Sequence, residues 1–122
     1  GREVQVFDIA AQPAKLVKTI PTGEGAHAFH ALGDGRHLFV SNRVANTISK
    51  IDLQSLEVVD SFKAPGGPDC MEVTADGRLL LVSSRWIQKV SVIEIASGRL
   101  LRQIRVGKSP HGIWTLEHAR RQ

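Results

Sequence analysis

The sequence repeats itself at an interval of 42 residues, and this repeat restricts the fold more than any other feature. When residues 26–67 are placed over residues 68–109, no gap is needed and ten positions are identical. The identities include an Asp-Gly-Arg turn, at positions 34–36 and 76–78. An interval of this length is typical of repeat architectures, in which each supersecondary unit buries its apolar surface against its neighbours.

Each repeat contains four short apolar or β-branched runs that are separated by turn residues. The first repeat reads AFHAL, HLFVS, TISKIDL and EVVDSF, and the second reads CMEVTA, LLLVS, VSVIEI and LLRQIRV. The glycine of the Asp-Gly turn supplies the positive φ that a tight hairpin requires. Runs of this length between such turns predict four antiparallel strands per repeat.

These strands indicate an all-β fold made of β-propeller blades. A continuous apolar run such as residues 79–82 suits a strand that is buried on both faces, as in a sheet stacked between two other sheets. Four-stranded antiparallel units that recur every ~40 to 45 residues are characteristic of propellers. A sandwich of hairpins would explain alternating strands, but it does not explain a repeat without gaps.

The repeat divides the chain into four segments. Residues 4–8 align with the third strand of the next repeat, so the chain enters in the middle of a blade. The predicted segments are the C-terminal half of a first blade (1–25), a second blade (26–67), a third blade (68–109) and the first strand of a following blade (110–122). About three blades do not close a ring, which takes ~4 to 8 blades. We therefore expect a fragment of a longer protein, with ring closure by oligomerisation or an open stack as the alternatives.

Residues 38–62 resemble the YVTN-type β-propeller repeat, a WD40-like unit. The family's Val-Thr-Asn-like triplet appears as VSN at 40–42, its Asn-Thr-Val-Ser-like run as NTIS at 46–49, and its strand aspartate as Asp52. The sequence GKSP at 107–110 is similar to the family's blade junction. Because proteins with this repeat are mostly exported, the resemblance implies a periplasmic or extracellular location. It identifies a scaffold, and one scaffold hosts many functions.

Composition excludes several classes of protein. The formal charge is +4, but the 16 basic residues are mixed with 12 acidic ones and only 5% of residues are aromatic, so no nucleic-acid partner is predicted. No apolar run approaches the ~20 residues of a transmembrane helix, and no signal peptide is visible. Cys70, the one cysteine, has no partner in the chain for a disulfide.

Three polar residues share one position of the repeat, directly after the blade junction. They are His27, Asp69 and His111. Since equivalent positions lie at the same level around a propeller axis, we expect these side chains near the mouth of the central channel. The main interpretation is that each caps an inner strand; the second is a small-molecule, anion or metal site. Adjacent blades are expected to hold the atoms too far apart for direct ligation, so no metal is predicted.

Further polar residues repeat near this position. Arg43 and Arg85 follow the second strand of their blades and are expected to bring positive charge to the same face. His30, Glu72 and Trp114 stand three positions after the first set. The predicted ligand-binding residues are His27, Asp69, His111, Arg43 and Arg85.

The sequence carries no motif that argues for catalysis, so an enzyme is not favoured. It has no Gly-rich phosphate loop, no Cys-x-x-Cys-His haem attachment and no nucleophile elbow. The leading hypothesis is a non-enzymatic propeller of the bacterial envelope that binds a small molecule or protein partner at the channel mouth. The cofactor is unknown, and a homo-oligomer is expected if the short chain is native.

The resemblance also implies an alternative function of a different class. Related propellers include haem d1-type and quinoprotein-like proteins and propeller lactonases. In a d1-type protein, a channel-facing histidine would bind the tetrapyrrole iron, and arginines would hold its carboxylates. The residues of matching type here are His27, His30 or His111, with Arg43 and Arg85.

Overall fold

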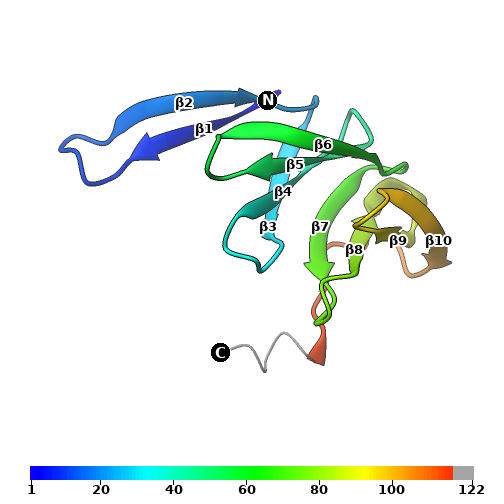
Figure 1. Ribbon diagram of the computed structural model, residues 1–122. Helices are drawn as coiled ribbons and strands as arrows, with labels where there is room; N and C mark the ends of the chain where they lie inside the picture. The colour runs from blue at the N-terminus through cyan, green and yellow to red at the C-terminus, as the bar shows by residue number, and fades with distance from the viewer. Residues whose placement is uncertain (117–122) are drawn as a thin grey trace.

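The computed structural model describes residues 1–116 and shows three antiparallel sheets in succession (Figure 1). The first is a hairpin of β1 (Glu3–Asp8) and β2 (Lys15–Pro21). The second contains β3 (Ala26–Ala31), β4 (His37–Asn42), β5 (Thr47–Asp52) and β6 (Glu57–Lys63), paired in that order. The third contains β7 (Pro68–Val73), β8 (Leu79–Ser84), the 3-10 turn η1 (Arg85–Ile87), β9 (Lys89–Glu94) and β10 (Arg99–Arg105). The predicted all-β fold of four-stranded propeller blades is confirmed.

The two complete sheets stand side by side, with their first strands β3 and β7 in contact. Each sheet is a simple antiparallel meander, so β3 and β7 are equivalent edge strands of successive blades. The β1–β2 hairpin lies on the other side of the first complete sheet and extends beyond it (Figure 1). Consecutive blades therefore follow one another around the side on which β3 and β7 lie, which is the arrangement of a propeller segment.

The main core fills the space between the two complete sheets. It combines Phe39, Ile48 and Phe62 of the first sheet with Val73, Leu80, Val82 and Ile93 of the second. A smaller core joins the hairpin to the first sheet and contains Ile20, Val40 and Ile51. Burial of each such side chain contributes roughly 1.5 to 3 kcal/mol. Stability therefore comes from packing between blades, as a stacked repeat requires.

Burial on both faces is clearest in the middle strand β4. Phe39 and Val40 are neighbours in sequence and point to opposite faces, yet neither is exposed to solvent. Strand β8 was expected to show the same pattern, but there Leu80 and Val82 are buried while Leu81 is half-buried. The two strands differ because of where their sheets lie. The sheet of β4 packs against the hairpin on one face and against the second complete sheet on the other, whereas the sheet of β8 packs against a neighbouring sheet on one face only.

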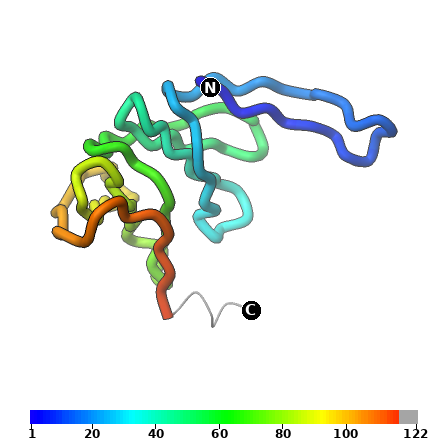
Figure 2. The backbone as a smooth tube through the Cα atoms, turned by 180° about the vertical axis from the view of Figure 1, so that it is seen from behind, coloured from blue at the N-terminus to red at the C-terminus, as the bar shows by residue number. Residues whose placement is uncertain are grey.

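The chain after β10 runs back along the last blade (orange to red in Figure 2). A first strand was expected at residues 112–116, but no strand forms within 106–116. A strand needs a hydrogen-bonded neighbour, and the described residues contain no second strand for this blade. The rest of the predicted segment, 117–122, lies outside the described residues. Within residues 1–116, no helix is long and apolar enough to cross a membrane.

Candidate functional site

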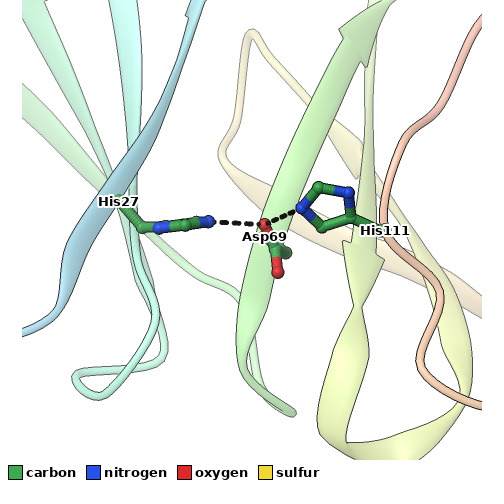
Figure 3. A group of neighbouring side chains, drawn as sticks. All are labelled: His27, Asp69 and His111. Carbon is green, nitrogen blue, oxygen red and sulfur yellow. Dashed lines mark ion pairs between the residues drawn. The ribbon is translucent and has the colours of Figure 1, made fainter.

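Three residues from successive blades meet at the starts of the inner strands. Asp69 lies between the imidazoles of His27 and His111, which approach it from the two neighbouring segments (Figure 3). The distance from Asp69 Oδ1 to His27 Nε2 is 2.9 Å, and to His111 Nε2 it is 3.6 Å. The equivalent positions of the repeat therefore converge in space, although they are 42 residues apart in sequence.

The other oxygen of Asp69 is held by two arginines. Asp69 Oδ2 accepts a hydrogen bond from Arg43 Nη2 at 2.9 Å and from Arg85 Nη1 at 3.3 Å. The Asp69 side chain is fully buried, whereas the two arginines are 25% and 37% exposed. Arg85 Nε also donates to the hydroxyl of Ser109 at 3.0 Å. One buried carboxylate thus gathers four cationic or potentially cationic groups around it, named here the Asp69 cluster: His27, Asp69, His111, Arg43 and Arg85.

The ionisation of Asp69 is decided by competing effects. Burial by itself would raise its pKa, but the charges of Arg43 and His27, with the hydrogen bond from Arg85, outweigh burial and lower the pKa of Asp69. The neighbouring Cys70 responds in the opposite direction, because burial and the nearby Asp69 charge raise the pKa of its thiol. Asp69 is therefore an anion at neutral pH, and Cys70 is a poor nucleophile.

Two serines at equivalent repeat positions fix the inner strands. The hydroxyl of Ser41 accepts a hydrogen bond from the amide of Ala28, which follows His27. The hydroxyl of Ser83 lies 3.2 Å from the carbonyl oxygen of Cys70 and 2.7 Å from that of His111. Ser83 thereby connects its own blade to the next segment and places the His111 backbone beside β7.

A second polar pair lies further along the same strands. His30 Nε2 is 3.3 Å from Glu72 Oε1, and Glu72 is almost fully buried. The amide of Val73 lies within hydrogen-bond distance of both side chains. Trp114, the third residue of this repeat position, is 62% exposed. His30 and Glu72 therefore join adjacent blades in the same way as His27 and Asp69 do, deeper in the structure.

Two clefts flank the inner strands. One, of about 450 Å³, lies between β1 and β3 and is lined by His27 together with Val4, Ala26 and Phe29. The other, of about 400 Å³, lies between the two Asp-Gly turns at the opposite end of β3 and β7. Only the first cleft adjoins the Asp69 cluster, so a ligand that contacts His27 has a concave surface beside it.

The sequence identified the members of this cluster but not how they interact. All five predicted residues come together, and the interpretation that they bind a ligand stays a prediction. The expected separation of the potential ligand atoms is corrected, because those of His27, Asp69 and His111 lie within 4.8 Å of one another. Sequence reasoning missed Ser109; its place in the GKSP junction was the available signal.

Four-stranded blades whose first strands converge on a shared polar cluster define the class of protein as a β-propeller. Within this class, the chain belongs to the YNCE-like beta-propeller family, whose sequence pattern matches residues 1–121. No curated protein matches the sequence.

Several solved propellers have similar structures. Hydrazine synthase of Kuenenia stuttgartiensis is 28% identical, with a TM-score of 0.69 over 72% of this chain and 25% of that one. The dihydro-heme d1 dehydrogenase NirN, solved in complex with DHE, is 23% identical, with a TM-score of 0.76 over 95% and 26%. A putative 6-phosphogluconolactonase from Bacteroides uniformis is 16% identical, with a TM-score of 0.65 over 90% and 38%. The chain thus spans about a quarter to two fifths of these structures. The predicted resemblance to β-propeller repeat proteins is confirmed, and the likeness to the d1-type protein NirN is a likeness of fold.

Proposed function

We propose that this protein is a non-enzymatic ligand-binding propeller and that its ligand binds at the Asp69 cluster, at the mouth of the central channel. The observation that carries the proposal is the convergence of two arginines and two histidines from successive blades on one fully buried carboxylate. Ligand sites are concave places where a few polar groups meet. The cleft beside His27 supplies the concave surface.

The charge of the cluster favours a small anion as the ligand. Arg43 and Arg85 carry two positive charges against the single negative charge of Asp69. His27 and His111 have exposed imidazole rings, so both can donate a hydrogen bond to a ligand at the surface. Guanidinium groups match carboxylate and phosphate oxygens in geometry and charge. Carboxylate- or phosphate-bearing small molecules are therefore the proposed ligand class.

The test is a titration with inorganic phosphate and with citrate, followed through the ring C–H signals of the histidines by NMR. We expect saturable shifts of the His27 and His111 signals, which His27→Ala and His111→Ala variants assign. His37 serves as the internal control because its ring contacts Asp34 at a turn. Non-saturable shifts, or equal shifts at His37, would mean that neither anion binds at the cluster.

A variant of an arginine tests anion binding without changing the histidines. Arg85→Gln removes one positive charge and leaves Arg43 to hold Asp69, so the fold is expected to survive. The affinity for citrate should fall by at least about 10-fold, since hydrogen bonds to charged groups contribute roughly 1.5 to 3 kcal/mol. An unchanged affinity in a folded Arg85→Gln protein would contradict the anion assignment.

A tetrapyrrole is the second candidate ligand, favoured by the exposed imidazole of His111 with an arginine nearby. NirN, a structural relative, was solved in complex with DHE. Titration with haem should then produce a shifted Soret band that weakens in His111→Ala. A Soret band identical in wild type and variant would reject this candidate. Quinoprotein-like and lactonase-like activities stay predictions.

Location and partners are part of the same proposal. We place the protein in the periplasm or outside the cell because the repeats that it resembles are mostly found in exported proteins. A protein partner would contact the loops around the cluster, such as the junction that carries Ser109. Fractionation of cells that express the whole protein tests the location, and recovery in the cytoplasm would contradict it.

A further inference from the structure

We propose that His27, Asp69 and His111 form a binding site for a divalent transition-metal ion such as Zn²⁺. Among residues 1–116, this is the one group of three histidine, cysteine or acidic side chains whose ligand atoms lie close enough to share an ion. Imidazole nitrogen and carboxylate oxygen are common zinc ligands. The inference goes beyond anion binding and does not rest on it, because the ion would bind lone pairs rather than positive charges.

The distances between the ligand atoms fit one ion. His27 Nε2 and His111 Nε2 lie 2.9 and 3.6 Å from Asp69 Oδ1, and one ligand atom from each of the three residues lies within 4.8 Å of the other two. Three ligand atoms that are no more than 4.8 Å apart all lie within about 2.8 Å of a common point, compared with zinc–ligand distances of about 2.0 to 2.2 Å. An inward movement of at most ~0.7 Å per ligand atom would therefore complete the coordination distances.

The two histidine side chains, which must shift to reach coordination distance, are exposed enough to do so. The His27 and His111 side chains are 40% and 61% exposed, so small rotations of their rings meet little packing resistance. Asp69 is fixed, because Arg43 and Arg85 both hold its Oδ2 and leave Oδ1 directed at the two imidazoles. Hydrogen bonds to the outer oxygen of a ligating carboxylate orient it in the same way in known metal sites.

The charges around the site indicate its coordination. Asp69 with Arg43 and Arg85 carries a net charge of +1 when the histidines are neutral, so affinity is expected to be lower than in a closed site with four protein ligands. Three protein ligands leave a position open for water or an anion. Arg43 and Arg85, which bind the other oxygen of Asp69, add positive charge close to the site, and this charge favours an anion over a neutral fourth ligand.

The test uses the purified protein, freed of metal with a chelator and titrated with CoCl₂ or ZnCl₂ in a buffer without phosphate or citrate. Visible absorption of bound Co²⁺ reports histidine coordination, and calorimetry with Zn²⁺ gives affinity and stoichiometry. We expect one ion per chain. His27→Ala and His111→Ala should each weaken binding at least about 10-fold, since loss of a second-shell partner alone typically costs ~10- to 100-fold.

The matched control is His37→Ala, which removes an imidazole that contacts Asp34 instead of Asp69. Its affinity for Zn²⁺ should equal that of the wild type. The proposal is overturned if the wild type binds neither ion saturably, if His27→Ala and His111→Ala bind Zn²⁺ as tightly as the wild type, or if His37→Ala weakens binding equally. Thermal unfolding without metal confirms that each variant is folded.

The metal test and the anion test fail independently. Metal is titrated without a multivalent anion, and phosphate is titrated onto metal-free protein. Loss of metal binding alone leaves the anion result unchanged, and the reverse also holds. If both bind, phosphate should shift the Co²⁺ spectrum by entering the open position, and an unchanged spectrum would place the two ligands at separate sites.

Discussion

Asp69 has more ion-pair partners than any other described side chain: two arginines and two histidines contact its carboxylate. Its two oxygens have different partners: Oδ2 accepts hydrogen bonds from Arg43 and Arg85, and Oδ1 faces His27 and His111. A buried carboxylate of this kind stabilises the fold only while its partners remain charged and in place. The same arrangement leaves the two exposed imidazoles as the groups that a ligand meets first.

Replacement of Asp69 by asparagine keeps the shape and removes the charge. We expect the free energy of unfolding to fall by about 2 to 3 kcal/mol, below the ~3 to 5 kcal/mol of a broken buried ion pair, because Arg43 and Arg85 keep partial contact with water. Urea denaturation measures this change. Asp60→Asn, an exposed carboxylate on β6, is the control and should lie within about 0.5 kcal/mol of the wild type.

Gly25 and Gly35 have similar backbone angles but different surroundings, so substituting each one separates the cost of a left-handed backbone from the cost of a steric clash. Gly25 and Gly35 have φ of +78° and +73°. A Cβ at Gly25 would lie 2.6 Å from the backbone nitrogen of Val44, whereas a Cβ at Gly35 would meet nothing within 4 Å. We expect Gly35→Ala to cost about 1 to 2 kcal/mol from the left-handed backbone alone. Gly25→Ala should cost roughly 1 to 3 kcal/mol more, because the backbone at Val44 would have to move away from the added methyl group. Equal losses in urea denaturation would mean that the junction does not restrict this position.

Among the elements, the inner strands place the site and the later strands supply the core. Strands β3 and β7 carry His27 and Asp69 at the same register position, and Ser41 and Ser83 on the next strands hold them there. In the first complete sheet, Asp52 closes the turn between β5 and β6. Its carboxylate accepts two hydrogen bonds from Arg36 and one from the amide of Gln54.

The Asp52 turn should make stability depend on pH in acid. The hydrogen bonds from Arg36, then that from the Gln54 amide, lower the pKa of Asp52 to about 2, against an ordinary aspartate value of ~3.9. A lowered pKa in the folded state stabilises the protein above the unfolded-state pKa. This stabilisation should be lost as the pH falls from about 4 to about 2. Urea denaturation at successive pH values tests it.

The expected signature is a weaker pH dependence in Asp52→Asn over this interval. Asp60→Asn, whose carboxylate is exposed on β6, should keep the wild-type dependence. If Asp52→Asn and the wild type lose stability in parallel between pH 4 and pH 2, another carboxylate is responsible for the acid sensitivity.

The whole molecule is a row of sheets whose end faces differ from its inner ones. Strand β4 is buried on both sides, while the β1–β2 hairpin packs Val4 and Val6 against the next sheet and exposes Phe7 and Leu16, which pair directly across the hairpin. In a propeller, every blade face of this kind is covered by another blade. Exposed apolar faces of stacked units promote association.

The exposed apolar surface of the β1–β2 hairpin, which includes Phe7 and Leu16, should therefore be the surface through which copies of this chain associate. We expect the average mass from light scattering to rise with concentration for the wild type and to stay near the monomer value for Phe7→Lys/Leu16→Lys. Val59→Lys, a comparably exposed position on β6, should behave as the wild type. A discrete oligomer of constant mass in both proteins would show that another surface makes the contact.

The sequence alone determined the blade repeat, the strands of the two complete sheets and the membership of the Asp69 cluster, because a period of 42 residues requires equivalent residues to occupy equivalent places. It did not determine residues 112–116, where a strand was expected and none forms. It also placed the Asp-Gly turns, where φ is positive at Gly35 and Gly77, but not the positive φ of Leu56, which occupies the place of Gly98 in the other repeat. Only the tertiary structure decided that the arginines bind Asp69 and that the two histidines reach the same oxygen. Those contacts join different blades, and their lengths depend on how sheets pack, which local propensity and periodicity do not specify.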